Sequence, residues 1–553
     1  MSLSTSLQLA ANALSTVQLG LQVTANNLAN AQTPGYIREE AVLRPLPTLR
    51  QGNLLFGLGV ELHAVRQKVD VFLVERLRAA TSDLANTETQ ENAFLQLESI
   101  LGELSDSDLS TSLTEFFASV NDVLNQPENL AIRNIAALQG GALSDQFHRI
   151  DKNVRDVRSD FNNQIVAAAT DINGFIEEIA KLNVQIVSLE QGGLTASDAV
   201  GLRDQRLIAL TGLASLLDIR TVEQVSGSVT VFTSGDFLVF NDITREVEVG
   251  FLTDRGLRVA EIHIIQTNAP VKFSSGKLDG LFTARDEILG NFLDQLDSFA
   301  QTLIFEFNRI HSSGQGLTGH SVLTSEFAVA DAFVALDQLG LPFTPEGGSF
   351  QVLVRNKETG LTSTSDVFID LDGLGTDTTA NDLIAALDSI DGVSAAIDAT
   401  GNVSISSDSE DLEFSFANDT SGILAALGLN TFFTGTTAKD IGVNSAIRAD
   451  STKFAVSRGG FGEDSENAVL LAGLFDAALD AQSGLSIANI YEQLVGNVAQ
   501  TAAGTRAVSD GFRAFKNTLE GQHLAISGVN IDEEAINLIG LQRAFQASAR
   551  VIT

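Results

Sequence analysis

The residues best suited to bind a metal ion lie in one short acidic stretch. Counted from Asp370 as the first position, Gly375 falls where a calcium-binding loop needs its glycine, and Asp372 and Asp377 supply further carboxylates. The same loop needs a bidentate glutamate at its last position, where this chain has Asn381. A strand end, a turn and a helix N-cap explain these residues equally well, so we predict no metal and no cofactor.

The other residues of catalytic type form no known constellation. The six histidines show neither HxH nor HExxH spacing, although a metal site assembled only in three dimensions stays open. Because the chain has no cysteine, it cannot form a disulfide, a thiol nucleophile or a cysteine-bound zinc site. No GxSxG motif or P-loop occurs, and Gly57 and Gly59 lack the third glycine of a dinucleotide site. We therefore predict that the protein is not an enzyme.

Composition argues against two classes of partner. The 553 residues are too many for one hydrophobic core, so several domains are expected. A formal net charge of −36 repels nucleic-acid phosphates and anionic lipid headgroups, and no apolar run is long enough to span a membrane. The first charged side chain is Arg38, whereas a secretory signal begins with basic residues. We expect no nucleic acid, no membrane insertion, and export only by a route without a cleaved signal.

The N-terminal segment carries a heptad seam, which is typical of a helix that packs lengthwise against other helices. Its members, spaced alternately by four and three, are Leu3, Leu7, Ala10, Leu14, Val17, Leu21, Thr24 and Leu28. The rest of this helix has no charge, and a helix surrounded by other subunits avoids charges because burying them unpaired is costly. Docking of an amphipathic helix on the chain's own domain is the alternative. The Pro34-Gly35 turn should end the helix.

The C-terminal segment mirrors this pattern. Its seam residues are Leu538, Leu541, Phe545, Ser548 and Ile552. Acidic residues 532–534 lie in the expected first turn, where carboxylates favour the positive end of the helix dipole, and Ser527-Gly528 makes a hinge before it. Two heptad helices at the termini predict a chain that leaves one packing layer and returns to it.

Between the termini the hydrophobic period changes several times. Helices are predicted from about residue 69, over 150–189 as a long heptad helix, and over 199–217, 281–311 and 467–523. A period of two predicts strands within 220–270, and a further α+β segment at 326–437 with strands at 349–355, 366–371, 402–406 and 413–417 and helices at 379–390 and 420–427.

These elements predict a multidomain α+β fold. Terminal heptad helices form a coiled-coil layer, a long-helix bundle follows, and β-rich or α+β insertions face outward. The predicted domains are 1–38 with 528–553 (terminal coiled coil), 39–325 with 438–527 (helical bundle, including the β-rich 220–270) and 326–437 (outward insertion).

The segment 25–36 resembles the N-terminal signature of flagellar rod, hook and hook-associated proteins. The residues that carry the resemblance are Asn26, Asn27, Asn30, Thr33, Pro34, Gly35 and Tyr36. Asparagine side chains can satisfy backbone groups at a helix end, and the Pro-Gly pair then turns the chain outward. Further blocks indicate which of these proteins the chain resembles most. The hook-associated protein 1 family has similar blocks at 275–282, 285–287, 296–297, 307–314 and 202–206. The segment 527–534 resembles a signature shared by hook-type proteins. Leu207 departs from the family's usual second acidic residue.

The resemblance implies a structural role at the hook–filament junction of the bacterial flagellum. It implies partners of four kinds: the hook protein, the second junction protein (hook-associated protein 3), further copies of the chain in a ring, and a cytoplasmic export chaperone at the C-terminal region. It also implies export through the flagellar type III apparatus to an extracellular position. A hook or distal rod protein is the nearest alternative, although the long helix at 150–189 argues against it. A wall-degrading hydrolase and an adhesive module at 326–437 are further alternatives.

Overall fold

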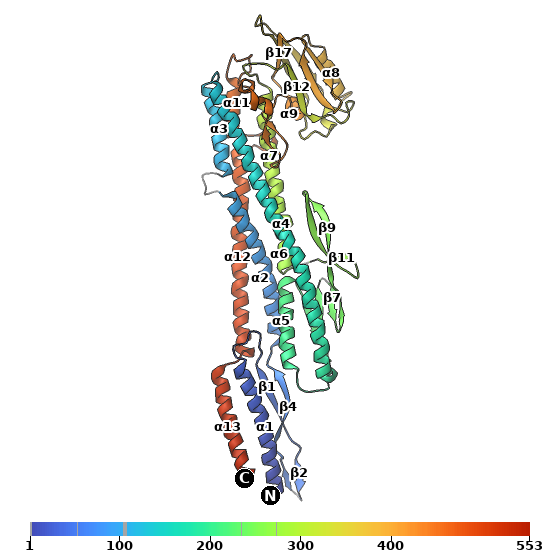
Figure 1. Ribbon diagram of the computed structural model, residues 1–553, viewed down its shortest axis with the longest axis vertical. Helices are drawn as coiled ribbons and strands as arrows, with labels where there is room; N and C mark the ends of the chain where they lie inside the picture. The colour runs from blue at the N-terminus through green and yellow to red at the C-terminus, as the bar shows by residue number, and fades with distance from the viewer. Residues whose placement is uncertain (1–2, 52–53, 103–107, 234, 273, 553) are drawn as a thin grey trace. The chain divides into compact units, whose positions relative to one another are not determined.

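The computed structural model describes residues 3–51, 54–102, 108–233, 235–272 and 274–552 (Figure 1). Internal contacts divide the chain into two compact units: unit 1 is Met1–Phe94, Arg158–Ile288 and Ala502–Thr553, and unit 2 is Leu95–Val157 and Leu289–Thr501. Helices α2 (Val71–Leu101), α4 (Leu130–Leu189) and α12 (Ile487–Ser527) contribute residues to both units. Among the described helices, none is both long and apolar enough to cross a membrane. The predicted division into three domains stays a prediction.

The terminal helices α1 (Leu3–Ala29) and α13 (Ile531–Ile552) lie side by side in unit 1 (Figure 1). After α1 the chain turns at Gly35, whose φ of +77° is one that glycine adopts without strain. It then forms an antiparallel pair, β1 (Glu39–Pro45) with β4 (Val60–Gln67), which contacts α1, and a shorter pair, β2 (Leu49–Gln51) with β3 (Leu54–Phe56). No strand was predicted here, because these strands bury too few side chains to show a clear period of two.

The long heptad helix is confirmed. Of its predicted inward residues, Val154, Phe161, Ile165, Ile172 and Ile186 are all at most 2% exposed. The helix is 60 residues long and starts at residue 130, well before the predicted 150. The extension over residues 130–149 was not predicted because it contains Gly140 and Gly141, and glycine is unfavourable in helix interiors. The Phe432 ring packs directly on the backbone at Gly140, and this tertiary contact outweighs the weak local propensity.

The predicted β-rich segment of unit 1 is also confirmed. It contains a four-stranded sheet in the order β5-β6-β7-β8 and a three-stranded sheet in the order β11-β10-β9. The strands are β5 (Arg220–Glu223), β6 (Val229–Thr233), β7 (Asp236–Phe240), β8 (Ile243–Thr244), β9 (Val247–Asp254), β10 (Leu257–Ile264) and β11 (Ala269–Pro270). Helix α5 (Val200–Leu216) precedes them, and α6 (Lys277–Phe282) follows and continues as one wide π turn at Thr283–Ile288.

Unit 2 combines helices with the predicted α+β segment. Its other helices are α3 (Leu109–Asn125), α7 (Leu289–Ser312), α10 (Ser445–Ala449) and α11 (Glu466–Gly473). Phenylalanine rings from three parts of the chain meet in its core, at 116, 117, 307, 432 and 433, with neighbouring centroids 4.8 to 6.3 Å apart. Such aromatic clusters combine large buried area with favourable ring geometry.

Two three-stranded sheets, β12-β16-β15 and β14-β13-β17, enclose the core of the α+β segment together with α8 and α9. The elements are β12 (Val322–Ala328), β13 (Gly348–Asn356), β14 (Thr362–Ile369), α8 (Ala380–Asp388), β15 (Val393–Ile397), β16 (Asn402–Ser407), β17 (Leu412–Ala417) and α9 (Ile423–Leu427), and a short pair β18 (Phe433–Thr434) with β19 (Gly442–Val443) follows. All four predicted strands and both predicted helices are present. Strands β12 and β15 were missed, and β12 starts before residue 326.

The acidic loop after β14 is a turn that leads into a helix. The carboxylates of Asp370, Asp372 and Asp377 lie within 4.8 Å of one another and are largely exposed. Asp377 accepts the backbone N–H of Gly373 (3.1 Å), and Asp372 accepts the backbone N–H of residue 374 (2.7 Å). Thr379 then caps α8 in a reciprocal capping box. The turn and the N-cap therefore account for this acidic pattern.

Candidate assembly surface

Asn27 is the centre of the terminal motif. Its side chain is 1% exposed, and the amide nitrogen donates to the Glu39 carbonyl oxygen (2.9 Å). Its side-chain oxygen accepts two hydrogen bonds of 2.9 Å, one from the Tyr36 hydroxyl and one from the Glu39 backbone N–H. Burial, together with nearby Glu39, raises the pKa of Tyr36 far above its usual value, so the hydroxyl keeps its proton and donates. Asn27 thus joins the helix end to the first strand.

The other asparagines of the motif act locally. Asn26 donates to the Glu39 carboxylate (2.9 Å), and Asn30 donates to the carbonyl and side-chain oxygens of Asn26, both at 3.1 Å. Thr33 donates to Asn30 (3.3 Å). These bonds close the last turn of α1 before the exposed Pro34, which explains the abundance of short polar side chains there.

An ion-pair cluster ties this turn to the start of α13. The Arg38 guanidinium contacts Glu534 at 2.6 Å and Glu533 at 3.2 Å, and Glu534 is 2% exposed. The Arg38 backbone N–H donates to the carbonyl oxygen of Ser527, the last residue of α12 (2.9 Å). The acidic first turn of α13 therefore has a specific partner in addition to the helix dipole.

The predicted seam of α1 is only partly covered in the single chain. Leu14, Val17 and Leu21 are half-buried, whereas Leu7 is 47% and Leu28 is 37% exposed, and the side chain of Leu3 lies outside the described part. The side chains most buried along the second half of α1 are Thr16, Val23, Thr24 and Asn27. With Thr24 as the exception, they lie one position before the predicted seam, on the side facing α13 and the β1–β4 pair. Packing of the predicted residues against other subunits stays a prediction.

The predicted seam of α13 lies closer to α1. Leu538, Leu541 and Phe545 are half-buried, and Ile552 is 37% exposed. A methyl group added at Gly20 would stand 3.4 Å from the Leu541 side chain, so the two helices approach closely at this point. A cavity of about 380 Å³ lies between the two helices and the β1–β4 pair.

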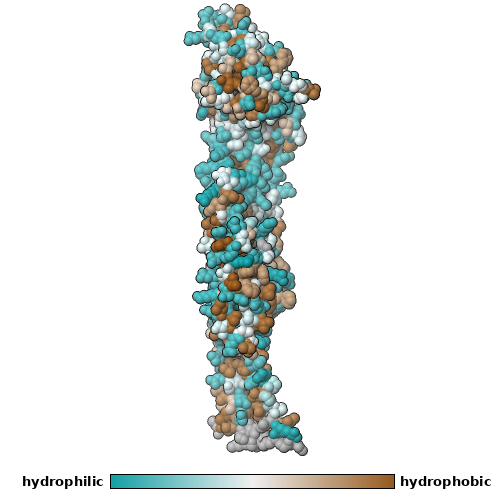
Figure 2. Space-filling model, turned by 90° about the vertical axis from the view of Figure 1, so that its right-hand side faces the viewer, coloured by the Kyte–Doolittle hydropathy of each residue, from teal (hydrophilic) through white to brown (hydrophobic). Residues whose placement is uncertain are grey.

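Both terminal helices expose large apolar side chains, some of them in the predicted seams. Those at least 37% exposed are Leu7, Leu9, Leu19 and Leu28 on α1 and Ile531, Ile536, Ile539, Val551 and Ile552 on α13. On the face drawn in Figure 2, hydrophobic residues lie mostly in small groups between hydrophilic ones. The exposed aliphatic side chains of this helix pair make it a candidate interaction surface.

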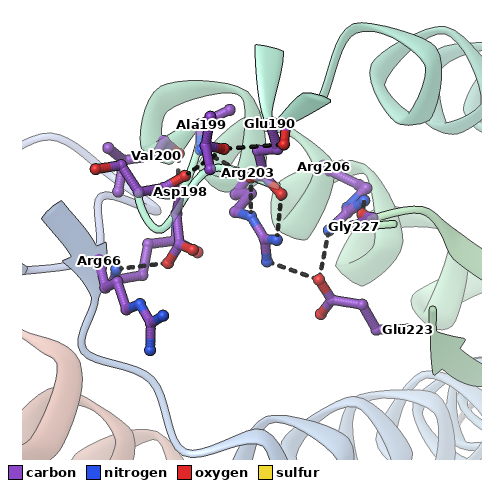
Figure 3. Close-up of polar contacts among 12 residues, drawn as sticks. Arg66, Glu190, Asp198, Ala199, Val200, Arg203, Arg206, Glu223 and Gly227 are labelled. Atoms are coloured by element: carbon purple, nitrogen blue, oxygen red, sulfur yellow. Dashed lines mark hydrogen bonds and ion pairs between the residues drawn. The ribbon is translucent and has the colours of Figure 1, made fainter. Parts of the chain in front are cut away.

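The block 202–206 organises a second polar cluster of unit 1 (Figure 3). Arg203 donates to both carboxylate oxygens of Glu190 (2.7 and 2.9 Å) and to Glu223 (2.7 Å). Burial opposes ionisation of Glu190, but the bonds from Arg203 and the Ala199 amide lower its pKa. Arg206 is 4% exposed and donates to the carbonyl oxygen of Gly227 (2.6 Å). The block thus joins α4, α5 and the following strands.

Asp204, between these arginines, faces the other way. It accepts the side-chain amide of Gln67 at the end of β4 (2.5 Å). Burial raises the pKa of Asp204 to about 6. Sequence reasoning recognised this block only by resemblance, since the charges that it pairs lie far apart in the chain.

Replacing Asn27 by alanine is expected to destabilise unit 1 by about 2 kcal/mol, because the partly buried Glu39 N–H and Tyr36 hydroxyl lose their acceptor. Asn26→Ala is the matched control: Asn26 is exposed, so the loss should stay below about 0.5 kcal/mol. Thermal unfolding of both variants measures the difference. Equal effects of the two substitutions would contradict the central role of Asn27.

Three family models match the chain. "Flagellar hook-associated protein FlgK helical domain" matches residues 94–324, "Flagellar basal body rod FlgEFG protein C-terminal" matches 520–553, and "Flagella basal body rod protein" matches 7–36. The last two cover the terminal helices and their motifs, and the first covers α4, α5 and the whole β-rich segment.

Curated relatives match along nearly the whole chain. The flagellar hook-associated protein 1 of Bacillus subtilis is 24% identical over 565 residues, covering 99% of this chain and 95% of the relative. That of Escherichia coli is 25% identical over 567 residues, covering 98% and 96%. Among solved structures, the flagellar hook junction protein FlgK from Burkholderia pseudomallei shares the fold, with a TM-score of 0.51 and 16% identity over 82% of this chain and 100% of that chain. The chain is thus similar along nearly its whole length to the flagellar hook-associated protein 1 of Bacillus subtilis and of Escherichia coli, and its residues 94–324 match the FlgK helical domain.

Proposed function

We infer that this chain is a structural protein of the bacterial flagellum and forms the junction between hook and filament. The observation that carries the inference is the pair of terminal helices: they lie side by side, Arg38 beyond the end of α1 pairs with Glu534 of α13, and both helices leave aliphatic side chains exposed. A helix pair that leaves aliphatic side chains exposed suits a tube of repeated subunits, in which neighbours cover those side chains.

The specific partners are part of the same proposal. Copies of the chain assemble in a ring on the hook protein, and the ring receives the second junction protein, after which flagellin assembles. A cytoplasmic chaperone binds the C-terminal region, and export uses the flagellar type III apparatus. The relatives are flagellar structural proteins, and we propose that this chain likewise makes and breaks no covalent bond.

Deleting the gene in its host tests this function. Electron microscopy should show hooks without filaments, and a blot should find flagellin lost to the medium. Absence of hooks would favour the alternative, a hook or distal rod protein. Intact and motile flagella would rule out a role at the junction.

Complementation by variants connects the function to the helix pair. Leu7→Asp and Leu28→Asp place charges on exposed positions, so the chain should still fold, but filaments should remain absent because a buried unpaired charge is costly in the assembled layer. Leu361→Asp is the matched control, since Leu361 is 73% exposed and lies outside the terminal helices. Restored motility with all three variants would contradict the proposed packing surface.

A further inference from the structure

A pocket of about 120 Å³ lies in unit 1 next to the cluster of Figure 3. Arg78 of α2 and Arg203 and Arg206 of α5 line it, together with Glu75 and Glu223. A pocket with three guanidinium groups is unusual in a chain with 34 basic and 70 acidic residues. The partners of each arginine therefore decide what the pocket can bind.

Two of the three arginines are satisfied within the chain. Arg203 is bound to Glu190 and Glu223. Arg206 donates to the side-chain oxygen of Asn183 (3.0 Å) as well as to the Gly227 carbonyl oxygen. These two guanidinium groups are held in place, and Glu190 and Glu223 offset their charge, so Arg78 is the cation left to bind an anion.

Arg78 is different. Its side chain is buried, with the residue 8% exposed, and its Nε and Nη1 atoms have no hydrogen-bond partner among the described residues. Glu75, one turn earlier on α2, is exposed and influences Arg78 only through its charge. Burial lowers the pKa of Arg78, but an arginine still keeps its proton at neutral pH. A buried guanidinium group with two unpaired nitrogens is costly for a folded protein.

We propose that this pocket is a binding site for one oxyanion, a carboxylate or phosphate group, that accepts hydrogen bonds from Arg78. Guanidinium groups bind such anions through directed, charge-assisted hydrogen bonds. The volume exceeds that of a single water, about 30 Å³, and leaves room for an oxyanion with its remaining hydration. The anion comes either from solution or from an acidic side chain of another subunit.

The test compares the full-length chain with Arg78→Met in chloride, phosphate and acetate buffers of equal ionic strength at pH 7. In chloride, Arg78→Met should melt at the same temperature or higher, because it removes a buried unpaired charge. In the buffer whose anion binds, the native chain should melt at a higher temperature than Arg78→Met, since only the native chain gains stability from binding. Isothermal titration should show saturable binding that Arg78→Met lacks.

Two further variants serve as controls. Arg78→Lys keeps the charge but loses the planar fork, and should bind the anion at least about tenfold more weakly. Arg44→Met removes an exposed arginine that pairs with Glu61 outside the pocket, and should bind as the native chain does. Preference for phosphate indicates a free anion, and preference for acetate indicates a side-chain carboxylate. The proposal would be overturned if Arg78→Met melted at a lower temperature than the native chain in chloride. It would also be overturned if the anions changed the melting temperature equally in all variants.

Discussion

Lowering the pH from 7 to 5 is expected to destabilise unit 2 by about 2 kcal/mol for each of two buried histidines. His311 is 0% and His320 is 8% exposed, and both contact Asn430. Burial lowers the pKa of each to about 4. Two neutral imidazoles in one core make this unit acid-sensitive.

The hydrogen bonds of His311 show why its neutral form is required. Its Nδ1–H donates to the Asn430 carbonyl oxygen (2.9 Å), and its Nε2 accepts the Ala455 backbone N–H (3.0 Å). A proton on Nε2 would break the second bond and place a charge near Arg133 and His320. His320 donates from Nε2 to the side-chain oxygen of Asn430 (3.0 Å), near the cation of Lys453 and the carboxylates of Glu413 and Asp450.

The direction of the effect follows from proton counts. An unfolded histidine has a pKa of about 6.5, so between pH 6.5 and pH 4 the unfolded chain binds more protons than the folded one. The two neutral histidines therefore cost the folded state no stability above about pH 6.5, and the free energy of unfolding decreases as the pH falls toward 4. Burial raises the pKa of Asp419 and Glu326, and these carboxyls contribute in the opposite direction.

Comparing variants separates the histidines from the carboxyls. Calorimetric melting of the native chain and of His311→Gln at pH 7 and pH 5 should show a smaller acid effect in the variant. His263→Gln, which changes a histidine of unit 1 beside Glu261, should keep the full acid effect of unit 2. An unchanged acid effect in His311→Gln would refute the assignment.

Replacing Gly280 by alanine is expected to destabilise unit 1 by about 3 kcal/mol. An added methyl group would stand 2.6 Å from the carbonyl oxygen of Asn86 and 2.8 Å from the Cβ of Thr89. The obstacle is the backbone of α2, so α6 must move away. That movement would also strain the bond from Asn86 to Asp279 (2.8 Å) and the bond from the Gly276 N–H to the Ser82 carbonyl oxygen (3.1 Å).

A glycine in open space is the matched control. Gly174, inside α4, has no atom within 4 Å of an added methyl group. Alanine there removes only the poor helix propensity of glycine, so Gly174→Ala should gain up to about 1 kcal/mol. The two substitutions should shift the melting temperature in opposite directions. A loss of less than about 1 kcal/mol in Gly280→Ala would show that α6 adapts without cost.

The sequence by itself determined the elements with a strong period and carried the resemblance to flagellar hook-associated proteins. The heptad spacing of 150–189 predicted both the helix and its buried face, because a helix that buries one side must repeat its apolar residues near every 3.5 positions. The acidic turn and the capping residue after β14 were readable for the same reason: their chemistry is local. The terminal motif was found through a run of neighbouring residues.

Only the tertiary structure decided which neighbour covers each face. Strands β1 and β4 depend on α1 for support and have little period of their own. The most buried side chains of α1 lie mainly one position from the predicted seam, because periodicity shows that a helix packs but not at what angle. Arg78, His311 and Gly280 look ordinary in the sequence. The unpaired nitrogens of Arg78, the burial of His311 and the close approach at Gly280 all arise from segments far apart in the chain. Such contacts cannot be predicted from the spacing of residues in the sequence.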